Sequence, residues 1–354
     1  MSGKVPRLVC TAAVAAGCVL APRPATAAPT PGPDARGVAE QLTDLQQLYR
    51  QAEQATETYD ATAEKLRKQR AEVARLDGAL AKARLSLQDS RGAAGRLARQ
   101  QYQNSTDISP YVRLLLARDP QQALDQGHVL GRLARERAET VGRLTGTEKQ
   151  ADTLARAARK ALDQQLSLAA RQKKDRDDVQ GRLRKVEELL VSLTPEQISA
   201  LGELEKSGTD KAQRQLVASG ALSDNRPPSP EGNRAVRYAV RQLGKPYQWG
   251  AEGPASYDCS GLTSQAWDRA GTPIPRTSQQ QWAQLPRVPL KQLRPGDLVV
   301  YFPEATHVAM YLGRGMVIQA PRTGEKIKVS PIAAFPVLGA VRPDGGQAPV
   351  SEAR

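Results

Sequence analysis

The sequence predicts an α+β protein, in which a long α-helical coiled-coil hairpin is followed by a smaller compact domain that contains both helices and strands. Two observations predict this two-part organisation. Residues 37–109 and 121–194 contain no proline, which leaves two uninterrupted tracts of more than 70 residues. Ten of the 14 aromatic residues fall between residues 233 and 342. Aromatic side chains fill cores efficiently, so a compact domain is expected in that window and not before it.

The first tract has a 3.5-residue apolar repeat. Steps of three and four residues from position 45 to position 97 give 16 positions, and 13 of them are apolar: Leu45, Leu48, Ala52, Ala55, Tyr59, Leu66, Val73, Leu76, Leu80, Ala83, Leu87, Ala94 and Leu97. A repeat sustained for that length is typical of a coiled coil. The same stepping through the second tract finds 14 apolar residues in 19 positions, which predicts a looser seam.

The two tracts are separated by a break near residues 104–120, which contains two prolines and the mostly apolar segment 112–116 (VRLLL). Two matched helices joined by such a break predict an antiparallel hairpin over residues 37–194, with arms of roughly 100 Å. Parallel dimerisation through the coil is the alternative. We expect a polar, proline-rich linker at 195–232, the compact domain at 233–342 and a disordered tail at 343–354.

The N-terminus has the pattern of a secretory signal peptide over residues 1–27. Lys4 and Arg7 precede an uncharged, mostly apolar stretch at 8–21, and the small residues Ala25 and Ala27 provide a cleavage site. The predicted location is therefore secreted and extracellular. Lipoprotein anchoring at Cys18 is a minor alternative.

The charge indicates the class of partner. The net charge is +14, and residues 233–342 alone carry 14 Lys or Arg against six Asp or Glu. Such a balance favours polyanionic partners. No zinc-finger spacing, phosphate-binding loop or RNA-binding motif supports a nucleic-acid partner. No apolar run reaches the length of a membrane-spanning helix, which excludes a multi-pass membrane protein.

Cysteine use indicates one reactive thiol. Removal of a signal peptide leaves Cys259 as the single cysteine, so an internal disulfide is impossible. Asp258 is a good N-cap for a helix that starts at Cys259. The amides and the dipole at a helix N-terminus favour a thiolate, so we expect a lowered thiol pKa and a nucleophile. A small buried core residue is the alternative.

A thiolate nucleophile requires a base, and the chain has two histidines. His128 lies in the second helical tract, so His307 is the candidate. His307 opens a predicted strand, a turn at 313–315 follows, and the return strand ends near Gln319. Pairing residue 312 with residue 316 puts His307 and Gln319 on one face, about 7–8 Å apart at Cα. The Gln319 carbonyl could then orient the imidazole.

Five segments, in this order, resemble those of NlpC-type cysteine peptidases: 246–250 (PYQWG), 258–262 (DCSGL), 275–278 (PRTS), 295–298 (PGDL) and 307–313 (HVAMYLG). The resemblance covers about 110 residues. It implies a papain-like α+β fold and hydrolysis of peptidoglycan stem peptides, typically at the γ-D-glutamyl–diamino acid bond. No metal and no cofactor are expected.

The resemblance also implies roles for particular residues. Cys259 resembles the nucleophile and His307 the base. Gln319 stands at the third catalytic position, which in the family is commonly a histidine. Tyr247 resembles a tyrosine near the thiol, while Asp258 and Ser260 resemble the pair that lines the substrate cleft.

The predicted function is thus that of a secreted cysteine endopeptidase of the cell wall, with the coil for targeting and regulation. The coil resembles that of coiled-coil wall hydrolases of Gram-positive bacteria, some of which contact a membrane transporter of the FtsEX type. Two alternatives stay open. One is a scaffold whose C-terminal domain binds wall peptides without cutting them, and the other is an amidase or acyltransferase on a related fold.

Overall fold

The computed structural model describes residues 34–103, 112, 120–222 and 226–345. The expected signal peptide and most of the expected tail lie outside these residues. Within the described ranges, no helix combines the length and the apolar character needed to cross a membrane.

Two long helices, α1 (Asp34–Gln103) and α3 (Pro120–Ser192), lie side by side along most of their length. Three contacts show that they run antiparallel. Thr62 bonds Asp175, Gln69 bonds Ala161 and Arg91 pairs with Glu148, so the partner number on α3 falls as the α1 number rises. We call this pair the helical hairpin.

Leu76 and Leu80, two of the expected seam positions, pack against Ala158 and Ala161 of α3, whereas the expected seam residue Tyr59 packs against Trp249 instead. The buried apolar residues of the pair are Leu45, Ala52, Ala55, Leu66, Leu76, Leu80 and Ala83 on α1, with Ala151, Ala158, Ala161, Val179 and Val186 on α3. Thr62 and Gln69, two seam positions that are not apolar, provide hydrogen bonds to α3. Two of the three polar interruptions of the first repeat are therefore paired with α3.

The expected linker at 195–232 contains a helix, which corrects the sequence-based prediction. Helix α4 (Pro195–Ala218) starts with Thr194 as its N-cap, Pro195 in its first turn and a reciprocal capping box between Thr194 and Gln197. These are strong helix-start signals, and they outweigh the polar composition that suggested a linker. Of the described residues in this stretch, 219–222 and 226–229 lie outside helices and strands.

The C-terminal domain is built on one antiparallel sheet of six strands in the order β1-β6-β2-β3-β4-β5. The strands are β1 (Arg287–Val288), β2 (Leu298–Tyr301), β3 (His307–Gly313), β4 (Met316–Gln319), β5 (Lys328–Pro331) and β6 (Val337–Val341). Three helices complete the domain: α5 (Pro230–Val240), α6 (Cys259–Arg269) and α7 (Ser278–Gln284). Two short 3-10 turns, Leu290–Gln292 and Ile332–Ala334, connect strands. The α+β class is therefore confirmed.

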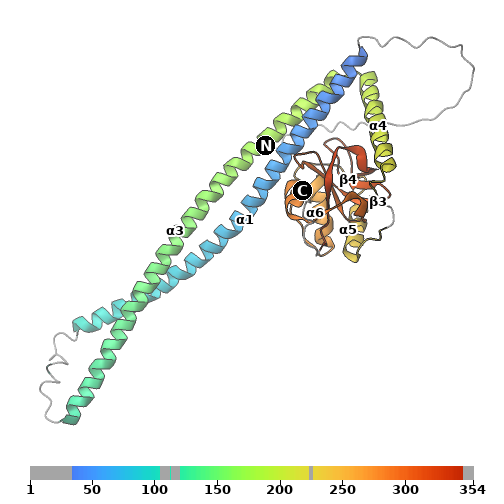
Figure 1. Ribbon diagram of the computed structural model, residues 1–354. Coiled ribbons are helices and arrows are strands. Elements are labelled where there is room, and N and C mark those ends of the chain that lie inside the picture. Colours follow the sequence, from blue (N-terminus) through green and yellow to red (C-terminus); the bar gives the residue numbers. More distant parts are fainter. Residues whose placement is uncertain (1–33, 104–111, 113–119, 223–225, 346–354) are drawn as a thin grey trace, which may run out of the picture.

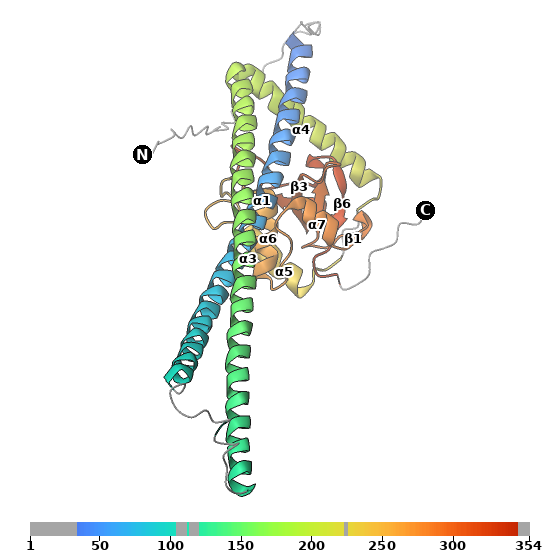
Figure 2. The same cartoon turned by 90° about the vertical axis from the view of Figure 1, so that its left-hand side faces the viewer.

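Both faces of the sheet are covered. Leu298, Val300 and Met310 face one core together with α5 and α6, whereas Val299 and Tyr311 face a second core. Leu216 of α4 packs against that second core. Since neighbouring side chains of a strand point to opposite faces, the fully buried strand β2 requires a cover on each side. Helix α4 supplies part of the second cover, and the helical hairpin passes beside it (Figures 1 and 2).

Candidate active site

Cys259 is the first residue of α6, as the N-cap pattern predicts. The Asp258 carboxylate accepts a hydrogen bond from the Gly261 amide at 2.6 Å and so caps the helix. Position 261 must be glycine here, since a Cβ would come within 2.2 Å of the Ala251 carbonyl oxygen. The first turn of α6 is thereby pressed against the 246–251 loop, and the thiol is fixed at the edge of the sheet.

The thiol is not activated in this arrangement, contrary to the sequence-based expectation of a lowered pKa. Burial raises the pKa of the Cys259 thiol well above its usual value, and the carboxyl groups of Glu57, Asp258 and Glu53 raise it further. The Val308 amide acts in the opposite direction but does not offset these effects. Helix-terminus stabilisation is overcome because the thiol is 4% exposed and surrounded by acidic groups.

His307 and Gln319 meet as predicted. The register pairs Met310 with Ile318 and Tyr311 with Val317, which places the two side chains on one face. His307 Nε2 and Gln319 Oε1 are 2.7 Å apart. An amide oxygen can only accept, so Nε2 carries the proton and Nδ1 presents a lone pair. Burial lowers the pKa of His307 to about 4, so the ring is neutral.

Helix α1 places three carboxyl groups against this site. Glu57 Oε1 lies 3.9 Å from Cys259 Sγ and accepts from the Ser260 hydroxyl at 3.1 Å, while Glu57 Oε2 accepts from the Ser278 amide at 2.8 Å. Glu53 Oε1 lies 3.7 Å from His307 Nδ1. Spacings of four and three residues put Glu53, Glu57 and Asp60 on one face of the helix.

Asp60 faces the residues expected to line the substrate cleft. The Arg276 guanidinium binds both carboxylate oxygens of Asp258, at 2.6 and 3.1 Å, and donates to the Ser260 hydroxyl at 2.9 Å. Asp60 adds a further ion pair to the same guanidinium at 3.4 Å. A second contact holds α1 nearby, where Tyr59 packs edge-on against Trp249 at 5.0 Å between centroids.

Tyr247 also lies at this site. Its hydroxyl is buried, and burial together with the nearby Cys259 and Asp258 raises the pKa of Tyr247 well above its usual value. The structure therefore brings together all six residues singled out from the sequence: Tyr247, Asp258, Cys259, Ser260, His307 and Gln319. Among the described residues, no cluster of His, Cys, Asp or Glu is arranged to hold a metal ion.

Burial in the interface changes the acidity of the α1 carboxyl groups. Desolvation raises the pKa of Glu53 to about 8 and that of Glu57 to about 7, and it raises the pKa of Asp60 as well. Glu57 and Asp60 are raised further by the neighbouring Asp258, and Arg276 counteracts this for both groups. The closed arrangement therefore favours protonated carboxyl groups on α1.

Sequence reasoning missed the four residues that close and organise the site: Glu53, Glu57, Asp60 and Arg276. The repeat drew attention to the apolar seam, and these acids lie beside it. One signal was available in the sequence. Glu53, Glu57 and Asp60 follow one another at helical spacing, and no basic residue interrupts this acidic row. Arg276 stands in the segment 275–278, whose role had not been assigned.

The C-terminal domain is similar to known proteins. The family model described as NlpC/P60 matches residues 244–336, which contain Cys259, His307 and Gln319. Residues 244–336 are an NlpC/P60 domain. A probable endopeptidase of Corynebacterium glutamicum (strain R) is 41% identical over 127 residues, which cover 36% of this chain and 60% of that protein.

Two further comparisons concern the hairpin and the domain. A probable endopeptidase of Mycobacterium tuberculosis is 27% identical over 342 residues, covering 85% of this chain and 89% of that protein, so its similarity extends through the helical hairpin. The solved NlpC/p60 domain of the peptidoglycan hydrolase SagA is 32% identical, with a TM-score of 0.30 and coverage of 31% of this chain and 97% of that one. The NlpC/P60 match, at residues 244–336, lies within the last third of the chain.

Proposed function

We propose that this protein is a secreted cysteine endopeptidase that hydrolyses peptidoglycan stem peptides, and that helix α1 holds it closed until a signal releases it. The observation that carries the proposal is the constellation of Cys259 on a helix N-terminus with the His307–Gln319 pair, inside an NlpC/P60 domain. Relatives named as endopeptidases support the same reaction class.

The residues divide the chemistry between them. Once α1 has moved away, His307 Nδ1 takes the thiol proton and Cys259 Sγ attacks the carbonyl carbon of the scissile amide. The proton passes to the leaving amine, and a thioester remains. Water then attacks the thioester with His307 as base, which releases the carboxylate and restores the thiol. Gln319 keeps the imidazole in the tautomer that this cycle needs.

The expected bond is the γ-D-glutamyl–diamino acid bond, and Tyr247, Asp258 and Ser260 are the proposed lining of the substrate cleft. Asp258 and Ser260 are held by Arg276, so they form a rigid polar wall next to the thiol. A module that only binds wall peptides is the alternative. The presence of thiol, imidazole and orienting amide in one site favours catalysis, because binding alone requires none of the three.

Closure by α1 follows from the positions of its acidic side chains. Glu57 faces the nucleophile, Glu53 faces the base and Asp60 faces the cleft-lining residues, so no substrate carbonyl can reach Cys259 in this arrangement. The segment expected to bind a membrane partner, residues 112–116, lies outside the described residues apart from Val112. The proposals of an FtsEX-type partner and of self-association therefore rest on the sequence alone.

The test is digestion of purified cell walls with the mature chain, followed by mass spectrometry of the soluble products. We expect new D-glutamyl carboxyl ends and new diamino acid amino ends, and none with Cys259→Ala. Release by mutation of α1 should increase the yield. Cleavage that is unchanged in Cys259→Ala would overturn the mechanism, and products cut at another bond would overturn the assigned specificity.

A further inference from the structure

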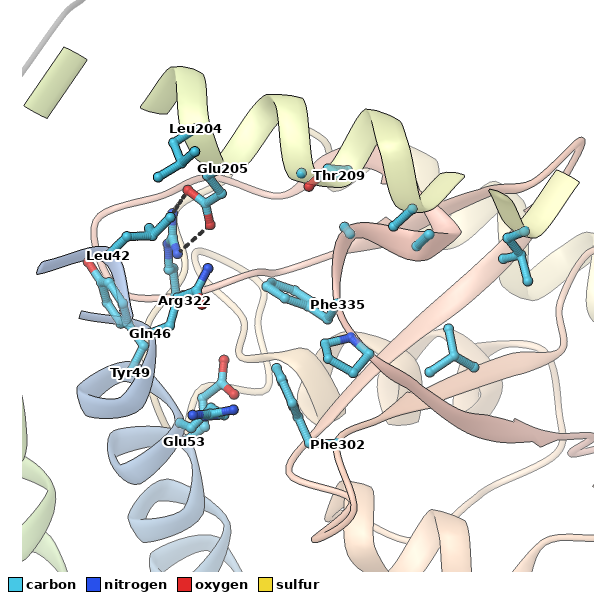
Figure 3. Close-up of a pocket in the computed structure, with 18 of the residues that line it drawn as sticks. Leu42, Gln46, Tyr49, Glu53, Leu204, Glu205, Thr209, Phe302, Arg322 and Phe335 are labelled. Atoms are coloured by element: carbon cyan, nitrogen blue, oxygen red, sulfur yellow. Dashed lines mark hydrogen bonds and ion pairs between the residues drawn. The ribbon is translucent and has the colours of Figure 1, made fainter. Parts of the chain in front are cut away.

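Helix α1, helix α4 and the NlpC/P60 domain enclose a cavity of about 800 Å³ next to the active site (Figure 3). Its three walls come from separate parts of the chain: residues 42–53 of α1, residues 204–216 of α4, and domain residues that include Phe302, Arg322 and Phe335. A volume of this size is ordinary for a small-molecule or short-peptide site. The proposed reaction does not use this space.

The cavity is separated from the His307 ring by one of its own lining residues. Phe335 is part of the cavity wall and packs edge-on against the His307 ring, with 5.1 Å between centroids. Phe302 packs against Phe335 at 5.5 Å and completes an aromatic wall. Glu53 lines the cavity as well and faces His307 Nδ1. Whatever fills the cavity therefore contacts the group that blocks the base.

Two oppositely charged side chains of α1 have unused binding capacity there. Glu53 is 8% exposed, and its Oε2 has no hydrogen-bond partner in the described part of the chain. Arg50 lies one turn earlier and is exposed, with its guanidinium 6.0 Å from the Phe302 ring centre and near enough for its charge to lower the pKa of Glu53. By contrast, the Arg322 guanidinium in the same wall is already bound to Glu205, at 3.0 and 2.9 Å.

A buried carboxyl oxygen without a hydrogen-bond partner and an exposed guanidinium, one helical turn apart beside an aromatic wall, complement a molecule with an ammonium and a carboxylate group. We propose that the cavity is an effector site for short zwitterionic peptides, the class of molecule that the proposed endopeptidase releases. The ammonium group binds Glu53, the carboxylate binds Arg50, and the aliphatic part lies against Phe302 and Phe335. This inference rests on the proposed function for the choice of peptide.

Such a ligand contacts α1 and the domain at the same time, so it binds the closed arrangement and stabilises it by mass action. Accumulating product would then slow further opening. Suppose the ligand binds only the closed form and Cys259 is modified only after the protein opens. A ligand concentration of ten times the dissociation constant should then slow modification of Cys259 by about 11-fold. The cavity is thus a feedback site.

The probe is the dipeptide L-lysyl-D-alanine, with its N-acetylated form and its C-terminal amide as matched controls. Titration calorimetry with the mature full-length chain should show binding of the dipeptide and weaker binding of both controls. Because burial keeps Glu53 protonated at pH 7, binding of an ammonium group should release a proton. Calorimetry in two buffers of different ionisation enthalpy measures that proton.

Variants assign the binding to this cavity. Thr209→Trp fills the cavity from α4, whereas Ser207→Trp adds the same bulk on the same helix at a position that does not line it. Arg50→Gln should weaken binding of the dipeptide but should leave binding of its C-terminal amide unchanged. In parallel, the alkylation rate of Cys259 should fall with added dipeptide in the wild type and in Ser207→Trp, and should not change in Thr209→Trp.

The proposal is overturned if the dipeptide does not bind, if Thr209→Trp binds it as well as Ser207→Trp does, or if alkylation is unaffected. These measurements require no turnover. A chain that failed to cut peptidoglycan could still show the effector site, and an active enzyme could lack it, so the two proposals fail separately.

Discussion

At the scale of single residues, the Cys259 thiol is controlled by its neighbours more than by its place on the helix. A thiol at a helix N-terminus ordinarily has a lowered pKa. Here burial and three carboxyl groups raise the pKa of Cys259, so the sulfur stays protonated while α1 is docked. Reactivity should therefore appear only when Glu53 and Glu57 leave the site.

Substitutions in the proposed catalytic group should separate chemistry from orientation. Cys259→Ala and His307→Ala should each remove wall cleavage, because no other thiol or neighbouring imidazole can substitute. Gln319→Ala should lower it by a smaller factor, on the order of 10- to 100-fold, since acid–base catalysis as a whole contributes about 100- to 10,000-fold. Muropeptide release measured beside circular dichroism checks this. Full activity of Gln319→Ala would remove it from the proposed mechanism.

Arg276 should act as a positioning residue for the cleft. Its side chain is 8% exposed and binds Asp258, Ser260 and Glu252 through a planar fork that lysine cannot reproduce. Removing it as Arg276→Ala should destabilise the chain by about 3–5 kcal/mol, because it leaves buried Asp258 unpaired. Urea unfolding measures this loss.

A second readout separates positioning from mere stability. Arg276→Lys keeps the charge, so it should fold better than the alanine variant yet cleave more slowly than the wild type. Added guanidinium at millimolar concentration should restore part of the activity of Arg276→Ala, and the same concentration of sodium chloride should not. Equal activity of Arg276→Lys and the wild type would contradict the positioning role.

Some residues of the candidate site could be predicted from the sequence and others could not. Cys259, His307 and Gln319 could be found from a helix cap, a count of histidines and a hairpin register, all of which depend on local spacing. Glu57 could not, because its contact with Ser260 joins residues 203 positions apart. No local pattern on α1 predicts which domain will dock on it.

At the scale of elements, helix α1 has two functions on two faces. One face packs against α3 through the apolar seam, and the other places Glu53, Glu57 and Asp60 in the active site. The apolar repeat could be read from the sequence because it recurs at every turn. The acidic row spans only two turns, and its meaning depends on tertiary packing.

Weakening the α1 contact should expose the thiol. At pH 6, Glu57→Ala removes two hydrogen bonds, from the Ser260 hydroxyl and the Ser278 amide, so closure should weaken. With a net value of about 0.5–1.5 kcal/mol for each bond, alkylation of Cys259 should become roughly 5- to 150-fold faster. Glu72→Ala is the matched control, because Glu72 is an exposed α1 residue paired with Arg75. Equal rates in the two variants would argue against closure by Glu57.

In helix α4, local capping signals and overall composition predict different structures. Its capping box and first-turn proline are local signals, yet its polar sequence resembles a linker. The structure explains the polarity, because α4 is bound to the domain largely through polar side chains. Gln213 donates to the Gly315 carbonyl and accepts from the Ala333 amide, and Glu205 binds Arg322. A minimal catalytic fragment should therefore start at Pro195.

At the scale of the whole molecule, closure brings acidic groups of α1 to a domain with an excess of basic residues. The charged groups that face the α1 acids are Arg276, Asp258 and Glu252 from the domain, with Arg322 from the loop before β5 and Arg50 from α1 itself. Burial nevertheless raises the pKa of Glu53 and Glu57, so desolvation outweighs the attraction of these guanidinium groups.

The pKa shifts predict that closure weakens as pH rises. Glu53 and Glu57 change from an ordinary value of 4.5 to about 8 and about 7 when buried. The closed form therefore holds more protons than the open form between pH 4.5 and 8, and closure loses stability across that window. His307 acts oppositely, with a pKa lowered from 6.5 to about 4, but only below pH 6.5. Above pH 6.5 the carboxyl groups act without this opposition.

Between pH 6.5 and 8, the logarithm of the Cys259 alkylation rate should rise with pH more steeply in the closed wild type than it does for an open thiol. An open thiol gains about one factor of ten in thiolate per pH unit below its pKa. Opening that also ionises Glu53 and Glu57 adds to this slope, up to about two further factors of ten near pH 6.5. The double variant Glu53→Gln and Glu57→Gln keeps the shape of both side chains and cannot ionise, so its slope should be smaller than that of the wild type, with only the thiol and Asp60 left to contribute. Equal slopes in the wild type and the double variant would show that proton uptake by α1 does not hold the enzyme closed.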